Sequence, residues 1–198
     1  MMAFRQKKQW LLPFLALLLL AADALLLGRD GAIHVDGAGV GFPAFRTESL
    51  DGRAVTDEIF AGKTTAVCVW TVRDAEISRA ALQHLAAIVG ELPENAQFIG
   101  LVGDLKAEDS ADKRTTAKAI AADCPAIFPQ LLINDEFMPF LTRLRSAPTV
   151  VFIDSAGRLV GQPVVGDEPE LVRKEFLRLM EKDSPRNHAL QKIQKALF

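Results

Sequence analysis

Short apolar segments alternate with segments of helical periodicity through most of the chain, and this alternation constrains the fold more than any other feature. Three continuous apolar runs have the length and composition of buried strands: residues 66–71, 98–102 and 149–153. Apolar residues at helical spacing predict helices that begin behind Asp74 and that cover 110–122 and 168–182. This order predicts an α/β fold with a mixed central sheet and helices on both faces.

Turn signals add a hairpin at each end of this pattern. Asp51-Gly52 lies between short apolar stretches and predicts an N-terminal β-hairpin. The turn at 154–157 predicts that residues 159–165 pair back onto the strand before it. An extended segment over 128–133 and a short helix over 135–145 complete the expected elements.

Composition narrows the function classes. The chain has 198 residues, 49% of them hydrophobic, which suits one globular domain with an extension. A formal charge of −2 without a basic block outside the N-terminus argues against a nucleic-acid partner. The three histidines show no metal-ligand spacing, and the sequence has no phosphate-binding loop, so we expect no metal and no cofactor.

The N-terminal segment predicts the location. Arg5, Lys7 and Lys8 precede an apolar run over 10–27, which as a helix spans about 27 Å, near the thickness of the hydrocarbon core. The basic flank predicts a cytoplasmic N-terminus and a domain on the extracytoplasmic side of the cell membrane.

Two interpretations of that segment remain open. It is an uncleaved signal anchor over residues 1–28, or a signal peptide cleaved after the small-x-small motif at 22–24. We favour the anchor, a single transmembrane helix, because three leucines continue the apolar run beyond the motif.

The rest of the chain divides into three segments. A Gly- and Asp-rich linker is expected over 29–41, the folded domain over 42–183 and a C-terminal tail over 184–198. Apolar residues at helical spacing in the tail predict a short amphipathic helix, docked on the domain or touching a membrane surface.

Three motifs follow one another along the expected domain. Residues 50–55 (LDGRAV) have a Leu-x-Gly-x-x-Val pattern, and Gly62-Lys63 then leads into an apolar strand that ends at Trp70. Residues 148–157 (PTVVFIDSAG) have a Pro-Thr-x-x-x-Ile-Asp-x-x-Gly pattern. In this order the motifs resemble the thioredoxin-like superfamily, and in particular its membrane-anchored TlpA/ResA and redoxin branch. The resemblance covers about residues 42–183 and implies a thioredoxin-like fold.

The chain departs from this family at the redox site. The family carries Cys-x-x-Cys after its tryptophan, and without a gap those positions fall on Asp74 and Ile77. The family's thiol–disulfide chemistry needs a thiolate at a helix N-terminus and a second thiol one turn on. We interpret Asp74 as a helix N-cap and Ile77 as a core-facing residue. The expected function is therefore a binding or accessory module without redox activity.

The resemblance also implies a binding surface that needs no cysteine. It places Trp70, Arg73, Ala147 and Pro148 around a cis-proline loop, and it predicts a cis peptide bond between Ala147 and Pro148. In this family the backbone before that proline pairs with an extended peptide. The expected partner is thus an extended peptide or another envelope protein, bound by strand addition.

The alternative is an oxidoreductase of thiols or peroxides that uses an unusual cysteine. Cys68 lies within a predicted buried strand, where a thiol usually acts as a small hydrophobic group. Cys124 follows a predicted helix and is the better candidate for an exposed, reactive thiol.

Overall fold

The computed structural model describes residues 42–124 and 128–182, all of which belong to the unit that spans Val35–Phe198. The anchor predicted over 1–28, the linker over 29–41 and the tail over 184–198 lie outside these residues. Within the described ranges, none of the helices combines the length and apolar character that a membrane span requires.

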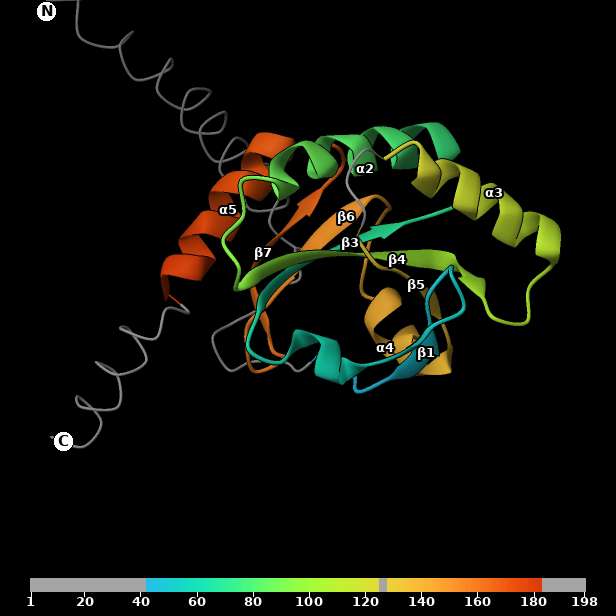
Figure 1. Ribbon diagram of the computed structural model, residues 1–198, viewed down its shortest axis with the longest axis horizontal. Coiled ribbons are helices and arrows are strands. Elements are labelled where there is room, and N and C mark those ends of the chain that lie inside the picture. Colours follow the sequence, from blue (N-terminus) through green and yellow to red (C-terminus); the bar gives the residue numbers. More distant parts are fainter. Residues whose placement is uncertain (1–41, 125–127, 183–198) are drawn as a thin grey trace, which may run out of the picture. The chain divides into compact units, whose positions relative to one another are not determined.

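A five-stranded mixed sheet forms the centre of the domain, as predicted (Figure 1). The strand order is β5-β4-β3-β6-β7, with β3 parallel to β4 and β4 parallel to β5, whereas β6 is antiparallel to both of its neighbours. The strands are β3 (Thr64–Trp70), β4 (Ala96–Lys106), β5 (Gln130–Ile133), β6 (Thr149–Ile153) and β7 (Leu159–Val165).

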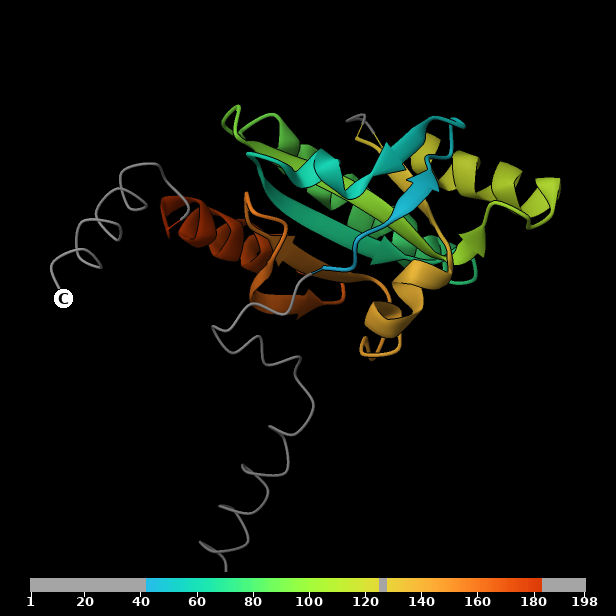
Figure 2. The same ribbon diagram turned by 90° about the horizontal axis from the view of Figure 1, so that it is seen from below.

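Helices cover one face of this sheet, and a second layer of short elements covers the other. The first face carries α2 (Ala75–Val89), α3 (Ala111–Ala122) and α5 (Pro169–Lys182). The opposite face carries the 3-10 helices η1 (Asp57–Phe60) and η2 (Asp135–Phe137) with α4 (Met138–Leu141), next to the hairpin β1 (Arg46–Glu48) and β2 (Ala54–Thr56) (Figure 2).

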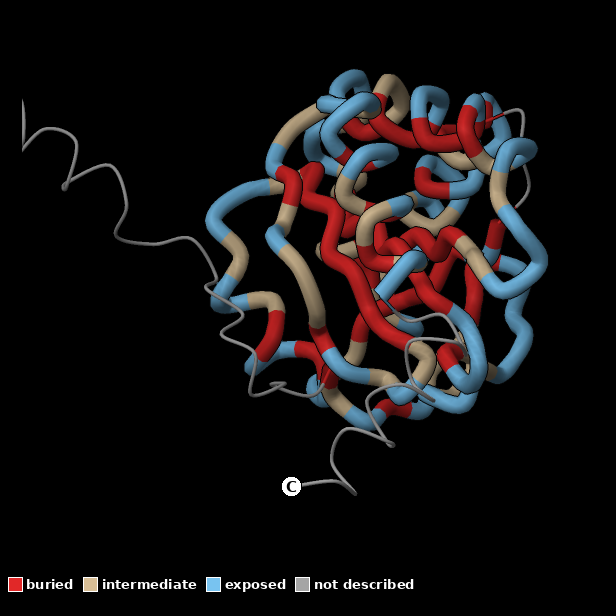
Figure 3. Tube along the Cα trace, turned by 90° about the vertical axis from the view of Figure 1, so that its left-hand side faces the viewer, coloured by how far each residue is buried: buried red, intermediate tan, exposed pale blue. Residues whose placement is uncertain are grey.

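The two layers produce two apolar cores, one on each side of the sheet. The helical side packs around Trp70, Leu82 and Phe176, and the other side gathers the rings of Phe42, Phe45, Phe60, Phe137 and Phe140. All seven residues of β3 are buried, so the continuous apolar run in the sequence reflects a strand covered on both faces. Figure 3 shows buried residues along the inner segments of the trace and exposed residues around its outside.

The N-terminal hairpin has the predicted turn and protects a sheet edge. Gly52 takes φ +82° in that turn, a conformation that favours glycine. The Leu50 amide donates to the Gln130 carbonyl over 2.8 Å, and Ser49 forms an isolated bridge with Leu131. The hairpin therefore covers the open side of the edge strand β5.

Register brings distant segments to one end of the sheet. Thr149, the first residue of β6, pairs with Val69 near the end of β3. The carboxyl ends of the parallel strands β3, β4 and β5 lie at that same end. We call it the carboxyl edge, and the loop before Pro148 reaches it as well.

Two predicted elements have different limits. The helix expected over 135–145 is instead η2 followed by the single turn α4, which ends at Leu141. Phe137 and Phe140 anchor this turn in the core, whereas within residues 142–146 only Leu144 packs against it. β4 runs to Lys106, beyond the predicted 98–102. Its pairing with β5 is irregular after Val102, but Lys106 pairs with β5 again and so extends the strand.

A buried hydrogen bond joins the ends of β3 and β5. The Trp70 indole Nε1 donates to Gln130 Oε1 over 2.9 Å, and both residues are buried. Gln130 reaches this position because its neighbour on β4, Gly100, has no side chain. A Cβ at Gly100 would lie 1.8 Å from Gln130 Oε1.

We expect Gly100→Ala to destabilise the domain by about 2 to 4 kcal/mol, because the new methyl group displaces Gln130 and leaves the indole N–H without its acceptor. Urea denaturation followed by circular dichroism measures the change in the free energy of unfolding. Gly90→Ala is the matched control, since nothing lies within 4 Å of a Cβ there. Equal midpoints for the two variants would contradict this account of Gly100.

Candidate functional site at the carboxyl edge

The loop before β6 has the predicted proline geometry. The peptide bond between Ala147 and Pro148 is cis, which confirms the prediction. Pro148 is buried and Ala147 is half-buried. The Pro148 carbonyl accepts from the Gly166 amide over 2.9 Å, so this loop is held to the segment that follows β7.

Asp74 stands directly before α2, as predicted, but its side chain does not cap the helix. Its Oδ2 instead accepts from the Thr71 hydroxyl over 3.0 Å. The buried Ser78 hydroxyl donates to the Thr71 carbonyl over 2.9 Å and accepts from the Thr71 amide over 3.2 Å. Local side-chain bonds therefore fix the loop between β3 and α2, and the Asp74 carboxylate stays exposed.

The interpretation of Ile77 as a core residue is wrong, because 55% of its surface is exposed. The helix buries the face that carries Ser78, Ala81, Leu82 and Leu85. At 100° per residue, Ile77 points away from the centre of that face. Its side chain is therefore an exposed apolar group in the first turn of α2.

The expectation that Trp70 lines a binding surface is also wrong. The residue is fully buried, and its indole N–H is bonded to Gln130. It supports the loop above it and has no surface to offer a partner. Arg73, in contrast, is exposed in that loop, as a binding role would require.

Both cysteines are buried, and neither is in a disulfide. Burial raises the pKa of the Cys68 thiol to about 12, and the negative charge of Asp167 adds to the effect. Cys124 has only 8% of its surface exposed, and its Sγ donates to the Leu82 carbonyl over 3.3 Å. The expectation that Cys124 is an exposed thiol is therefore wrong, and Cys68 is no better placed to react.

An aspartate that the sequence interpretation missed holds the loop before α2. Asp104 lies in the part of β4 where pairing with β5 is interrupted. Its Oδ1 accepts from the Val72 amide over 2.8 Å and its Oδ2 from the Arg73 amide over 3.1 Å. The signal was its position just after the apolar run at 98–102, where polar side chains are expected to meet the carboxyl edge.

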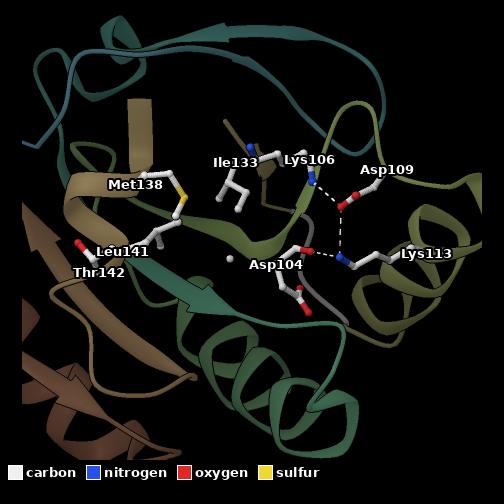
Figure 4. Close-up of a pocket in the computed structure, with 9 residues that line it drawn as sticks. Asp104, Lys106, Asp109, Lys113, Ile133, Met138, Leu141 and Thr142 are labelled. Atoms are coloured by element: carbon white, nitrogen blue, oxygen red, sulfur yellow. Dashed lines mark hydrogen bonds and ion pairs between the residues drawn. The ribbon is translucent and has the colours of Figure 1, made fainter. Parts of the chain in front are cut away.

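A pocket of about 450 Å³ opens beside Asp104 (Figure 4). One wall is apolar and the opposite wall is charged. The residues that line it are Gly103, Asp104, Lys106, Asp109, Lys113, Ile133, Met138, Leu141 and Thr142.

The charged side chains of this pocket pair with one another or with close neighbours. Lys106 Nζ lies 2.6 Å from Asp135 Oδ1, which raises the pKa of Lys106 and lowers that of Asp135. Lys113 Nζ lies 3.2 Å from Asp109 Oδ2 and also donates to the Asp104 carbonyl. The pKa of Asp109 is lowered by the Lys106 amide, which donates to it, and by Lys113.

Among residues 42–124 and 128–182, no group of His, Cys, Asp or Glu side chains is arranged to hold a metal ion. His84 is exposed, and its Nδ1 lies 2.7 Å from Asp167 Oδ1.

No family model matches the sequence, and no curated protein matches it. Solved structures do match. The thioredoxin domain of a thiol-disulfide oxidoreductase from Bacteroides vulgatus is 18% identical with a TM-score of 0.53, over 69% of this chain and 95% of that one. An exposed lipoprotein thioredoxin from Streptococcus pneumoniae is 20% identical with a TM-score of 0.55, over 68% of this chain and 98% of that one.

A DsbF homologue from Corynebacterium diphtheriae reaches a TM-score of 0.59 at 15% identity, over 76% of this chain and 94% of its own. These similarities show that the chain has a thioredoxin-like fold.

We expect Asp104→Asn to loosen the loop before α2, because an amide side chain has one acceptor oxygen for the two backbone N–H groups that the carboxylate now serves. The free energy of unfolding should fall by about 1 to 2 kcal/mol. Hydrogen exchange should accelerate at Val72 and Arg73. Asp51→Asn, in the exposed hairpin turn, is the control, and unchanged exchange in Asp104→Asn would refute the role of Asp104.

Proposed function

We propose that this thioredoxin-like domain is a binding module that has no thiol–disulfide activity and that holds an extended segment of a partner at the carboxyl edge. The observation that carries the proposal is the chemistry of that edge. Asp74 and Ile77 occupy the positions that correspond to the redox cysteines by sequence, and both thiols of the chain are buried elsewhere.

Exposed apolar groups support a binding role for this edge. Val165, at the end of β7, is 55% exposed and pairs with Thr149 next to the cis-proline. Ile77 is equally exposed in the first turn of the helix that follows β3. Exposed apolar side chains at the same edge as a half-buried backbone segment suit an extended peptide, whose main chain pairs while its side chains rest on these groups.

The proposal includes a location. We propose that the N-terminal segment is a signal anchor that holds the domain on the extracytoplasmic side of the cell membrane. The basic flank and the long apolar run in the sequence support this placement. The partner would then be another protein of the cell envelope.

The competing function is thiol–disulfide or peroxide chemistry by Cys124 or Cys68. What favours it is the description of several structural neighbours as thiol-disulfide oxidoreductases or interchange proteins. What opposes it in this chain is the burial of both thiols and the raised pKa of Cys68.

Reactivity of the thiols decides between the two functions. At pH 8 a thiol with a pKa near 12 is ionised to about one part in ten thousand, so Cys68 should not react with iodoacetamide in the folded chain. We expect both cysteines to be alkylated about 100-fold more slowly in the native than in the denatured chain, as mass spectrometry would measure.

The control is Asp74→Cys, which adds an exposed thiol at the start of α2 that should react at once in the folded chain. An insulin-reduction assay completes the test. The full chain should show no turnover, and the double variant Asp74→Cys, Ile77→Cys should gain it. Turnover by the unmodified chain that disappears in Cys124→Ser or Cys68→Ser would overturn the proposal.

Replacing the exposed apolar side chains by charged ones tests the binding role. A phage-displayed library of random dodecapeptides, panned against the full chain in lipid nanodiscs, supplies the peptide probe. Ile77→Glu and Val165→Glu should each weaken binding of an enriched peptide by about tenfold, because a carboxylate replaces apolar contact area. Leu177→Glu, at a similarly exposed position on α5, should leave binding unchanged. Equal losses in all three variants would contradict the placement of the site.

A further inference from the structure

The pocket beside Asp104 has one apolar wall, on which Met138 is exposed, Leu141 is half-buried and Ile133 is buried. Ile133, at the end of β5, and Leu141, on α4, form this wall together with Met138 (Figure 4). Met138 is 41% exposed, although its neighbours Phe137 and Phe140 are buried in the core. A flexible thioether at the mouth of a pocket can adapt to different apolar groups.

The charged groups on the other wall already have hydrogen-bond or ion-pair partners. Lys106 is held by Asp135, and Lys113 is held by Asp109 and by a backbone carbonyl. Both carboxylate oxygens of Asp104 accept backbone N–H groups. A charged ligand would therefore meet groups that already have partners, and binding it would cost their desolvation. An apolar group would instead cover the exposed Met138 and the half-buried Leu141 without breaking a hydrogen bond.

The pocket is continuous with the loop that replaces the redox site. Gly103 lies between the end of β3 and α4, since a Cβ there would be 3.5 Å from the Trp70 carbonyl oxygen and 3.9 Å from Leu141 Cδ2. Asp104, next in the chain, binds the backbone of Val72 and Arg73. α4, on the other side, leads through residues 142–146 to the cis-proline loop. The pocket and the Ala147–Pro148 segment thus both lie at the carboxyl edge and are joined by residues 142–146.

We propose that this pocket is a specificity subsite that takes one uncharged apolar side chain, of leucine, isoleucine, methionine or phenylalanine, from the extended segment bound at the carboxyl edge. The inference rests on the proposed binding function and adds to it the chemistry of the partner. A volume of about 450 Å³ exceeds that of any single side chain, so neighbouring peptide atoms share the space.

The test pairs a change in the pocket with a change in the peptide. Dodecapeptides enriched on the full chain in lipid nanodiscs are synthesised with a fluorescent label, and their affinity is measured by anisotropy. Replacing the shared apolar residue of such a peptide by alanine should weaken binding to the unmodified chain by about 10- to 100-fold.

Thr142→Trp should remove that difference, because an indole at this exposed position on the pocket rim fills the space. The matched control is Thr115→Trp, at an exposed position on α3 where the hydroxyl likewise donates to a backbone carbonyl. In that variant the parent peptide and its alanine version should differ as they do on the unmodified chain.

The outcomes separate the two proposals. Failure of the library to yield any peptide enriched over empty nanodiscs would overturn the proposed function, and the subsite with it. Enriched peptides that share no apolar residue, that share a charged one, or that lose equal affinity on the unmodified chain and on Thr142→Trp would overturn the subsite alone. Loss of the difference in Thr142→Trp but not in Thr115→Trp establishes it.

Discussion

The pairing of β3 with both of its neighbours is the constraint on which the rest of the domain depends. β3 is buried along its whole length and is bonded to the parallel β4 on one side and the antiparallel β6 on the other. That arrangement brings the end of β3, the interrupted stretch of β4 and the start of β6 to the carboxyl edge. The Trp70–Gln130 hydrogen bond then ties this end of β3 to β5 through the space that Gly100 leaves open. The candidate site is a consequence of that register, since no segment of the chain forms it alone.

The positions and types of the main elements could be predicted because the sequence carries them locally. The run over 149–153 became β6 at the same residues, and the helix expected behind Asp74 begins at Ala75. Asp-Gly in the hairpin turn and the cis bond before Pro148 were also predictable, the first from turn chemistry and the second from the family resemblance. The short helix near 135–145 was predicted too long, because its length depends on which aromatic rings find space in the core. Local pattern therefore determined the elements, and tertiary packing determined where some of them end.

The side chains of the site were harder to predict, because exposure depends on how a helix is rotated against the sheet. Ile77 fits the apolar spacing of its helix, yet the buried face centres on residues about 100° away, so the spacing alone placed it wrongly. Cys124 follows a helix, where exposure is common, but its thiol contacts a carbonyl on α2. The sequence predicted no role for Asp104, because a single carboxylate after an apolar run is common. Its role depends on an interruption in strand pairing that directs it toward the backbone of a neighbouring loop.

The hydrogen bonds at the carboxyl edge suit the proposed binding function better than they suit thiol–disulfide chemistry. In a thiol–disulfide enzyme, the loop before the helix must leave a thiolate accessible and tolerate a disulfide that opens and closes. Here that loop is fastened instead, by Asp104 to two backbone amides and by Ser78 to both backbone groups of Thr71. A loop fixed by four hydrogen bonds presents its neighbours in a constant geometry, which reduces the ordering cost of binding. The proposed binding needs neither thiol, because strand addition at a proline loop uses backbone groups and contact at exposed apolar side chains uses hydrocarbon surface.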